Sequence, residues 1–503
     1  MKILSAIQMH RVDEFTMRNE PISSLALMER AGKSCFDWIR KNTPVGSRFL
    51  IVCGSGNNGG DGLVIARLLT EGGIETEVYI IPFTKHSDDF SKNLSAAKKS
   101  SVSIREINNE ANIFIQEGTI VIDAILGTGI SRSAHGIVGH VIDTINKSGN
   151  EIISIDLPSG LFADAKSEGN VIHAHHTLSF QNPKLAFFFS ENEKNIGQVH
   201  ILEIGLDKNF IEECDSKKYI LSQEFINTLI IPRAKFSHKG TFGHSLLICG
   251  SMGKIGAAVL SGRGCLRSGT GLLTVHIPAC GYTILQTAVP EAMVEVDADV
   301  NIITEVSGID KFDAIGIGPG IGRSEATEKM FIHLLEQYKK PIVIDADALN
   351  ILSASHENFK LFPENSILTP HPKEFERLVG KSSDDFDRHQ MQIDFSQKHK
   401  VIVVLKGAHT CITTPDGNVF FNSTGNAGMA KGGSGDVLTG IITALLAQKY
   451  QPLEAAIIGV YVHGLAGDFA AIKKGLISML PSDLIKCLPK AFKRLYNSRL
   501  NKT

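Results

Sequence analysis

Two glycine-rich segments of different design lie in the two halves of the chain. Gly54–Gly62 reads Gly-Ser-Gly-Asn-Asn-Gly-Gly-Asp-Gly, and Gly432–Asp436 reads Gly-Gly-Ser-Gly-Asp. Each follows an apolar run typical of a strand and opens a stretch typical of a helix. A glycine loop at a helix start can direct several backbone N–H groups at a phosphate. Two such loops of unlike sequence predict two active sites that act on phosphate-bearing ligands.

The length of the chain, 503 residues, is too great for one ordinary hydrophobic core and predicts two or three domains. In both halves strand-like runs alternate with helix-like stretches, which predicts α/β domains with parallel sheets covered by helices on both faces. Strands are expected at 48–53, 77–81, 119–123 and 152–156, and at 245–249, 272–277, 314–317, 341–345, 366–369 and 401–405. Helices are expected at 61–69, 136–146, 436–449 and 453–474, with two more before residue 48 and a break at Gly32. A polar stretch within 210–232 is expected to link the two halves.

The composition argues against several kinds of binding partner and structural site. The formal net charge is -2 and no lysine- or arginine-rich block occurs, so the basic face required for non-specific nucleic-acid binding is not expected. The eight cysteines form no C-x-x-C pair, which favours a reduced cytoplasm over a disulfide framework or a structural zinc site. Polar residues interrupt the N-terminal segment, and no uninterrupted apolar stretch is long enough to span a bilayer. We therefore expect neither a signal peptide nor a membrane partner.

Acidic residues stand at the ends of two expected strands in the first half. Asp123 precedes a Gly-Thr-Gly turn, and Asp156 precedes a Pro-Ser-Gly turn that contains Ser159. Ligands of open parallel sheets collect at the carboxyl ends of the strands, so two acids beside a glycine loop favour a site over two ordinary turn residues. With Asn58, they offer the all-oxygen surroundings that suit a hard cation.

The first glycine loop formally matches the dinucleotide pattern G-x-G-x-x-G, in which glycine allows positive φ and close backbone approach. Asp61 in this loop would repel phosphate, and a capping role at the helix start is favoured for it. Asn57 and Asn58 either tolerate left-handed turn geometry or contact a ligand. The loop alone does not identify a cofactor.

Asp436 directly follows the glycines of the second loop. It either caps the helix or takes the proton from a hydroxyl that attacks phosphorus, and the association of acid and glycines favours catalysis. Asp345 and Asp347 would share a face of an extended segment, where they either order a hydrated magnesium or end a strand. His371 lies between two prolines, which would present its side chain from a stiff loop.

The first half resembles the NAD(P)H-hydrate epimerase domain over residues 1–215. The motifs that carry the resemblance are Leu27-Met-Glu-Arg-Ala-Gly32, Gly54–Gly62, Asp123 with Gly127-Thr-Gly129, and Asp156-Leu-Pro-Ser-Gly160. The resemblance implies a Rossmann-like three-layer sandwich that epimerises hydrated nicotinamide dinucleotides, NADHX and NADPHX. Implied substrate contacts are Asn57, Asn58, Gly59, Gly60, Asp61, Gly127, Thr128, Gly129, Ile130, Ser131, Arg132, Ser133 and Asp156. Potassium would be bound by Asn58, Asp123 and Ser159, and we take Asp156 as the candidate for proton transfer.

The second half, residues 225–503, resembles the ADP/ATP-dependent NAD(P)H-hydrate dehydratase domain, which has a ribokinase-like α/β fold. The matching motifs are His238-Lys-Gly-Thr-Phe-Gly243, Gly250–Ala257, Gly318-Pro-Gly320, Asp345-Ala-Asp-Ala-Leu-Asn350, Thr369-Pro-His-Pro-Lys-Glu-Phe375, Lys406–Thr410 and Asn426–Asp436. Implied contacts to the hydrate are Ala257, Gly320, His371 and Asp436. Implied contacts to the adenine nucleotide, expected with Mg²⁺, are Lys406, Gly407, Ala408, His409, Thr410, Gly432, Gly433, Ser434 and Gly435. Lys431 either helps to hold phosphate or is a solvated loop residue.

The two resemblances together imply a bifunctional cytoplasmic enzyme of cofactor repair. The first domain would interconvert the R and S epimers of NADHX and NADPHX. The second would dehydrate the S form at the expense of ADP, giving NAD(P)H, AMP and phosphate. The alternatives are a ribokinase-like kinase of vitamin precursors fused to a nucleotide-binding domain, and a cofactor-binding sensor. We expect a homo-oligomer whose partners are small-molecule nucleotides, with no nucleic acid and no membrane.

Overall fold

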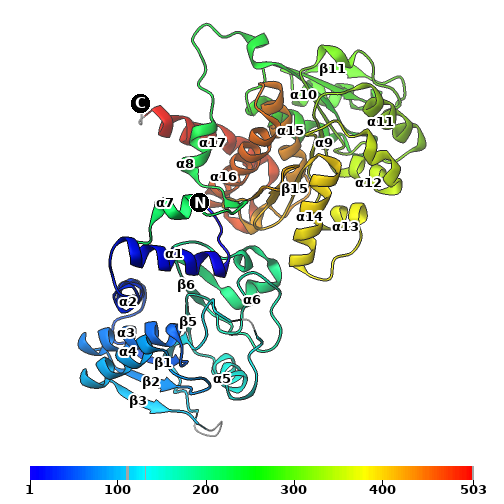
Figure 1. The fold of residues 1–503 in the computed structure, drawn as a ribbon. Coiled ribbons are helices and arrows are strands. Elements are labelled where there is room, and N and C mark those ends of the chain that lie inside the picture. The colour runs from blue at the N-terminus through cyan, green and yellow to red at the C-terminus, as the bar shows by residue number, and fades with distance from the viewer. Residues whose placement is uncertain (109–112, 131, 501–503) are drawn as a thin grey trace. The chain divides into compact units, whose positions relative to one another are not determined.

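The structure, a computed structural model, describes residues 1–108, 113–130 and 132–500. The chain divides into two compact units. The N-terminal unit comprises Lys2–Ser216 and Asp384–Phe386, and the C-terminal unit comprises Met1, Lys217–Ser383 and the chain from Asp387 onward. Each unit is built on a sheet of its own with helices packed against it (Figure 1).

Seven parallel strands form the sheet of the N-terminal unit, in the order β3-β2-β1-β4-β5-β6-β7. Their bounds are β1 Arg48–Cys53, β2 Thr76–Ile80, β3 Ser103–Glu106, β4 Thr119–Ala124, β5 Ile152–Ile155, β6 His176–Phe180 and β7 Gln198–Leu202. The chain builds outward in opposite directions from β1 and β4, so these two neighbours form the switch point at which open parallel sheets bind ligands. The loops that follow β1 and β4 meet there.

Helices cover both faces of this sheet. They are α1 Ala6–Asn19, α2 Ser24–Asn42, α3 Asn57–Glu71, α4 Asp88–Lys99, α5 Gly136–Lys147, α6 Glu193–Ile196 and α7 Lys208–Glu213. Alternate side chains of β1 enter different cores: Phe49 and Ile51 pack with residues of α1 to α4, whereas Leu50 and Val52 pack with residues of α5. A parallel sheet buried on both faces gives three layers, so the predicted Rossmann-like sandwich is confirmed.

Helix α2 is continuous, and the predicted break at Gly32 is wrong. Gly32 lies inside the helix, where a Cβ atom would stand 2.5 Å from Val64 Cγ1 of α3. The glycine lets the two helices approach closely. That packing outweighs a helix propensity about 1 kcal/mol poorer than that of alanine.

Ten strands form the sheet of the C-terminal unit, in the order β11-β10-β9-β12-β13-β14-β15-β16-β17-β8. Their bounds are β8 Lys218–Ile220, β9 His244–Ile248, β10 Leu272–Ile277, β11 Met293–Val296, β12 Ala314–Ile317, β13 Ile342–Ile344, β14 Ile367–Leu368, β15 Ile402–Leu405, β16 Cys411–Thr413 and β17 Val419–Phe421. The strands from β11 to β15 run parallel, whereas β16 is antiparallel to both of its neighbours. The switch point of this sheet lies between β9 and β12.

Two helical layers enclose this sheet. The α-helices are α8 Gln223–Leu229, α9 Ile255–Arg267, α10 Tyr282–Ala288, α11 Glu325–Gln337, α12 Ala346–Ala354, α13 Pro372–Val379, α14 Asp385–His399, α15 Ser434–Ala447, α16 Pro452–Ser478 and α17 Pro481–Leu500. Short 3-10 helices lie at Leu185–Phe188, Ser190–Asn192, Lys239–Phe242, Ala279–Gly281, Ile309–Lys311, His356–Leu361 and Ala427–Met429. One core joins β13 to β17 with α15, α16 and α17, and another joins β9, β12 and β13 with α11 to α14.

Strand β8 lies within the stretch 210–232 that was expected to link the two halves, and the boundary between the two units falls just before it, between Ser216 and Lys217. The strand pairs in parallel with β17, with Lys218 opposite Val419, and α8 follows it directly. A strand of three residues is too short to show an alternating pattern, and its partner lies in a distant part of the chain. The sequence therefore carried no readable signal for this pairing.

Helix α16 covers the stretch that was predicted to be helical at 453–474. By length and composition it could cross a membrane, with a mean hydropathy of 1.6 in its most apolar 18-residue window. However, 78% of that window is buried inside the unit, as in the core helix of a globular domain. The helix therefore packs as part of the core, and it kinks at Gly475, whose φ is 73°.

Helices α9 and α15 pack backbone against backbone, and this contact yields the first prediction. A Cβ on Gly440 would stand 2.0 Å from Ser261 O, so Gly440→Ala should lower the free energy of unfolding by about 2 kcal/mol or more. Gly256→Ala is the control, since Gly256 lies in α9, the partner helix of this contact, but a Cβ there would meet nothing within 4 Å. Thermal unfolding of both variants measures the difference, and equal midpoints would contradict the packing argument.

Two candidate active sites

The glycine loop of the N-terminal unit lies at the switch point between β1 and β4. Helix α3 begins at Asn57, directly after Gly56. A Cβ on Gly54 would stand 2.0 Å from Ile125 O in the loop after β4, and a Cβ on Gly59 would stand 1.9 Å from Gly54 O. None of the glycines from 54 to 62 has a positive φ, so that part of the prediction is wrong. The glycines serve here by permitting close contact of backbone with backbone.

Asp61 does not cap helix α3, and the favoured interpretation is corrected. The N-cap residue is Gly56, and Asp61 lies one turn further into the helix. Burial raises its pKa well above the usual range, and the carboxylates of Asp156 and Asp13 raise it further. Asp61 is thus one member of a cluster of acids.

Asp156 and Lys184 form the charged centre of this cluster. Asp156 follows β5 with a left-handed φ of 63°, which is a strained conformation for a residue with a Cβ. Its Oδ2 accepts a hydrogen bond from Thr128 N at 3.2 Å, and its Oδ1 lies 3.4 Å from Lys184 Nζ. Lys184 is 1% exposed, and its ammonium also donates to the carbonyls of Phe180 and Asn182. The backbone thereby fixes both charges of the pair.

Asp13 of α1 is a further member that sequence reasoning missed, as it missed Lys184. Burial, assisted by the Asp156 carboxylate, raises the pKa of Asp13 to about 6 against the opposing effect of Lys184. Asp13 gave no signal, because an acid on an amphipathic helix is ordinary. Lys184 did give a signal in the sequence, because a lysine that directly precedes the apolar run Leu185–Phe189 stands where a buried residue is expected.

The three residues predicted to bind a cation lie around the loop after β4. The buried carboxylate of Asp123 accepts hydrogen bonds from Ser154 Oγ at 2.8 Å and from Ser159 N at 2.9 Å, and Ser159 Oγ donates to its other oxygen. Burial raises the pKa of Asp123, and these hydrogen bonds oppose the rise. The amide of Asn58 is buried beside Gly127 and has no hydrogen-bond partner within the described residues. An unsatisfied amide oxygen and a buried carboxylate, both at the loop after β4, fit a hard cation.

Some of the other residues predicted to bind the dinucleotide are buried in the core, and others lie at exposed or half-buried positions. Gly60 faces Met28, because a Cβ there would stand 2.6 Å from its Sδ. The residues at exposed or half-buried positions in the loop after β4 are Gly127, Thr128, Gly129, Ile130, Arg132 and Ser133. Ser131 lies outside the described residues.

In the C-terminal unit a cavity of about 460 Å³ lies at the switch point between β9 and β12. It is lined at the starts of α9, α12 and α15, which bring together five of the predicted residues. These five are Ala257, Gly320, Gly432, Gly433 and Asp436. The cavity also holds Lys254 and Glu374, which belong to the motifs but had been given no contact, and Asp347, for which a magnesium contact and a strand end had been left open.

Asp436 is the third residue of α15, whose N-cap is Gly433 in a left-handed conformation with φ 94°. The capping alternative is therefore excluded. Burial raises the pKa of Asp436 to about 6, the carboxylates of Asp345 and Asp347 add to the rise, and Lys406 opposes it. The free backbone donors at an N-terminus without a side-chain cap favour an anion beside Gly433.

Asp345 holds the lysine of the site in place. Its buried carboxylate accepts hydrogen bonds from Lys406 Nζ at 2.8 Å and from Thr439 Oγ1 at 2.7 Å. Burial alone would raise the pKa of Asp345, but Lys406 and these hydrogen bonds hold it below the usual value. Lys406 Nζ also lies close to Gly435, at 3.3 Å from the position of a Cβ there. The ammonium thus faces the glycine loop.

Asp345 and Asp347 do not share a face of an extended strand, as the sequence suggested. Asp345 is the N-cap of α12, and Asp347 lies in its first turn. Asp347 Oδ2 accepts hydrogen bonds from Lys254 Nζ at 3.1 Å and from Gly322 N at 2.9 Å. The two carboxylates therefore have different partners.

His371 caps helix α13. Its Nδ1 accepts hydrogen bonds from the N–H groups of Lys373 and Glu374 at 3.1 and 3.2 Å, and its own N–H donates to Glu374 Oε2. Burial lowers the pKa of His371, and Glu374 opposes that shift. Glu374 lines the cavity and His371 does not, so the histidine stands beside the cavity.

Of the remaining predicted nucleotide contacts, Gly407 to Thr410 lie in the turn between β15 and β16, and Ser434 lies at the start of α15. Gly407 N and Gly407 O both pair with Thr410 Oγ1, and Ala408 is exposed between them. His409 Nδ1 lies 3.3 Å from Asn422 O. Ser434 is buried beneath the glycines, and its carbonyl lies 2.9 Å from His463 Nε2. Lys431 Nζ donates a hydrogen bond to Ile477 O at 2.6 Å at an exposed position.

Comparison with known proteins gives matches to both units. Residues 24–186 match the family described as YjeF-related protein N-terminus, and residues 245–490 match the family described as NAD(P)H-hydrate dehydratase. The chain is 34% identical to the bifunctional NAD(P)H-hydrate repair enzyme Nnr of Moorella thermoacetica, over 98% of this chain and 97% of the relative. It is 35% identical to Nnr of Escherichia coli, over 92% of this chain and 88% of the relative.

A solved structure supports the fold of the C-terminal unit. A ribokinase-like superfamily protein from Enterococcus faecalis is 30% identical with a TM-score of 0.50, and it covers 56% of this chain and 96% of its own. The ribokinase-like fold predicted for the second half is confirmed. The similarity to the repair enzymes spans both units and is not confined to one shared domain. The chain belongs to the family of bifunctional NAD(P)H-hydrate repair enzymes.

Proposed function

We propose that this protein repairs hydrated nicotinamide dinucleotides in two steps. Residues 1–215 interconvert the R and S epimers of NADHX and NADPHX. Residues 225–503 dehydrate the S form at the expense of ADP, which gives NAD(P)H, AMP and phosphate. The observation that carries the proposal is the similarity of the chain, across both units, to proteins named as bifunctional repair enzymes.

In the dehydratase step, Asp436 is the proposed general base. A hydroxyl is a poor leaving group, so the enzyme first makes it a phosphate ester. Asp436 takes the hydroxyl proton as the oxygen attacks the terminal phosphorus of ADP, and AMP leaves. The lone pair of the ring nitrogen then expels phosphate from the neighbouring carbon, and loss of a proton from the next ring carbon returns the electron pair to nitrogen and forms the double bond of NAD(P)H. The N–H groups of Gly432, Gly433 and Gly435, at the start of α15, stabilise the negative charge on the transferred group.

The nucleotide contacts follow from the same geometry. Lys406, fixed by Asp345, faces the glycine loop and neutralises phosphate charge. The turn Gly407–Thr410 continues the same edge of the sheet toward the rest of the nucleotide. Ala257 and Gly320 bound the cavity on the side of the hydrate, with His371 next to Glu374.

Mg²⁺ is proposed to enter with ADP and to neutralise its phosphates. Asp345 is hydrogen-bonded to Lys406 and Thr439, and Asp347 is hydrogen-bonded to Lys254. These carboxylates are already paired, so the residues fit an ion held mainly by phosphate and water.

In the epimerase step, Asp156 is the proposed acid and base. The hydrated carbon bears a hydroxyl and the ring nitrogen. Asp156 takes the hydroxyl proton as the C–N bond opens to an aldehyde and delivers that proton to nitrogen. Reclosure on the other face of the carbonyl reverses the proton transfers and inverts the carbon. Lys184 keeps Asp156 oriented, and the Asp156 carboxylate raises the pKa values of Asp13 and Asp61.

Asn58, Asp123 and Ser159 are proposed to hold potassium. The ion would supply fixed positive charge beside the dinucleotide phosphates, on the loop that these residues support. The orphaned amide of Asn58 supports this assignment. A homo-oligomeric state and a cytoplasmic location belong to the same proposal, which light scattering and cell fractionation test.

The central experiment follows reduced-nicotinamide absorbance after mixing the protein with NADHX. ADP and ATP are supplied in parallel reactions, and the R and S epimers are separated by chromatography. Recovery of NADH from both epimers is expected with ADP. No recovery with either nucleotide would exclude the dehydratase and favour a kinase of another small molecule.

Asp436→Asn should reduce dehydration by about 10²- to 10⁴-fold, because the variant keeps the shape of the site and loses the base. Epimerisation of R-NADHX should be unchanged, since Asp436 belongs to the C-terminal unit. Chromatography of the two epimers with and without ADP measures both activities in one sample. Full dehydration by the variant would remove Asp436 from proton transfer.

The pH dependence of dehydration should show a limb near pH 6. The pKa of Asp436 is raised to about 6, and a base acts only when deprotonated, so kcat/KM should rise as the pH rises through about 6. The measurement uses S-NADHX, which bypasses the epimerase. A flat profile from pH 5 to pH 8 would contradict the assignment.

Asp156→Ala should slow the turnover of R-NADHX by about 10²- to 10⁴-fold and leave that of S-NADHX unchanged. The reason is that only the R form must pass through the epimerase before dehydration. Asp143→Ala in α5 of the same unit is the control, and it should change neither rate. Equal loss for both epimers would indicate unfolding, and no loss for either would remove Asp156 from epimerisation.

A further inference from the structure

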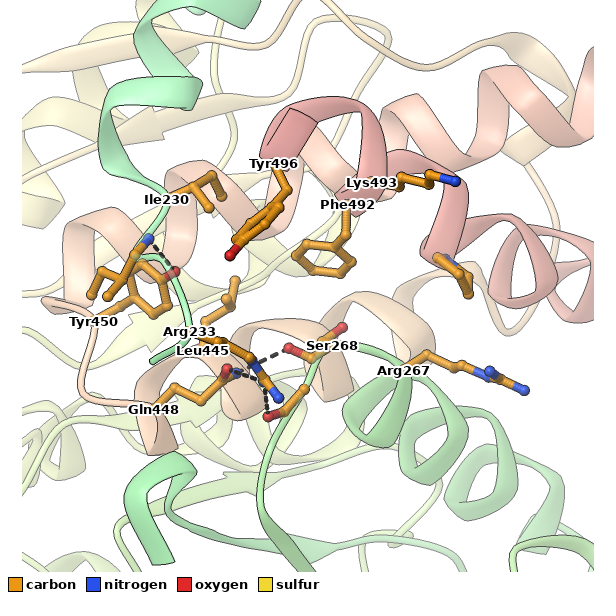
Figure 2. A pocket seen from close by; sticks show the side chains of 13 residues that line it. Ile230, Arg233, Arg267, Ser268, Leu445, Gln448, Tyr450, Phe492, Lys493 and Tyr496 are labelled. Carbon is orange, nitrogen blue, oxygen red and sulfur yellow. Dashed lines mark hydrogen bonds between the residues drawn. The ribbon is translucent and has the colours of Figure 1, made fainter. Parts of the chain in front are cut away.

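A second cavity, of about 370 Å³, lies in the C-terminal unit (Figure 2). Its volume falls within the range of roughly 300–1,000 Å³ typical of small-molecule sites. It is bounded by the C-terminal ends of α9 and α15 and by α17, whereas the catalytic cavity lies at the N-terminal ends of α9 and α15. Helix α9 has 13 residues and is therefore about 20 Å long, so the two cavities are separate.

The walls of this cavity are largely apolar and partly aromatic. Phe492 and Tyr496 enter from α17 on one side, and Leu445 of α15 lies opposite (Figure 2). The hydroxyl of Tyr496 points into the cavity and has no hydrogen-bond partner in the part of the chain that the structure describes. Flat apolar walls with one free polar group suit a planar aromatic ligand.

The polar side of the cavity is positively charged. Arg233 lies on its floor, where Nη2 donates to Gly269 O at 2.5 Å and to Gln448 Oε1 at 2.9 Å. Both partners are neutral, and so is the ring of Phe242 beneath the guanidinium at 3.8 Å. Arg267 and Lys493 add two cations at the rim, and no acidic residue lines the cavity. The field inside it therefore favours an anion.

We propose that this cavity is a second ligand site, which takes a small aromatic anion. The ring would lie between Phe492 and Leu445, and the anionic group would face Arg233. An aryl carboxylate and a nucleoside monophosphate share this chemistry. The site goes beyond the repair reaction, because none of its lining residues borders the catalytic cavity.

The test uses the fluorescent aromatic sulfonate 8-anilinonaphthalene-1-sulfonate with the full-length protein, at saturating ADP so that the nucleotide loop is occupied. One saturable site is expected. Arg233→Gln keeps a donor and removes the charge, so it should weaken binding at least about fivefold, since charges 4 Å apart in water attract by roughly 1 kcal/mol. The control Lys381→Gln removes an exposed cation that does not line the cavity, and it should leave binding unchanged.

A second pair of measurements keeps the test decisive. Lys493→Gln should weaken binding in the same direction if Arg233→Gln proves unstable, and neither variant should alter binding of the neutral N-phenyl-1-naphthylamine. Displacement of the sulfonate by benzoate identifies an aryl carboxylate site, and displacement by AMP identifies a nucleotide site. No saturable binding, equal affinities in all variants, or displacement by neither competitor would overturn the proposal.

Discussion

The approach of backbone to backbone, closer than a Cβ atom allows, is the constraint on which both sites depend. In the N-terminal unit, Gly54 lies against Ile125 O and brings the loops after β1 and β4 together. In the C-terminal unit, a Cβ on Gly318 would stand 1.8 Å from Asp345 O, which joins the loop after β12 to the start of α12. These contacts hold the loops together at the switch points that the strand order creates, and the helix N-termini there then face the ligands. The glycines thus act first on the fold and only through it on the ligand.

Both sites contain more carboxylates than cations. Asp156 and Asp13 both interact with the buried ammonium of Lys184, and burial together with the Asp156 charge keeps the pKa values of Asp13 and Asp61 high. Around Asp436 the acids are likewise crowded, with Lys406 committed to Asp345. Carboxyl groups crowded in this way have raised pKa values, so they can take up and release protons near neutral pH. Both proposed reactions need such a group, because each moves a proton from a substrate hydroxyl.

The sequence predicted the long, regular elements and the ordered motifs, but not what depends on distant contacts. The alternating runs predicted the strands at the two switch points, because fully buried strands are continuously apolar. Gly32 and Asp61 were misinterpreted by local rules of helix ends, since only the packing of α2 on α3 and the start of α3 at Asn57 decide their roles. Strand β8 and the approach of Asp13 to Asp156 arise from pairings between remote segments. The family motifs identified the acids and glycines of the sites, whereas the fixed partners Lys184 and Thr439 required the structure.

The contact of α9 with α15 limits which amino-acid substitutions the chain can accept. Gly440 lies against Ser261 O, and a Cβ on Gly264 would stand 2.8 Å from Val437 O. Every single-base change that alters a glycine codon gives either a stop or a residue with a Cβ atom. No single-base change at either of these two codons therefore gives a residue that the helix contact tolerates. The loops beyond the helices are not bound by this constraint. Amino-acid substitutions in this family should therefore accumulate in the loops around α9 and α15, while the residues at the contact between the two helices should stay unchanged.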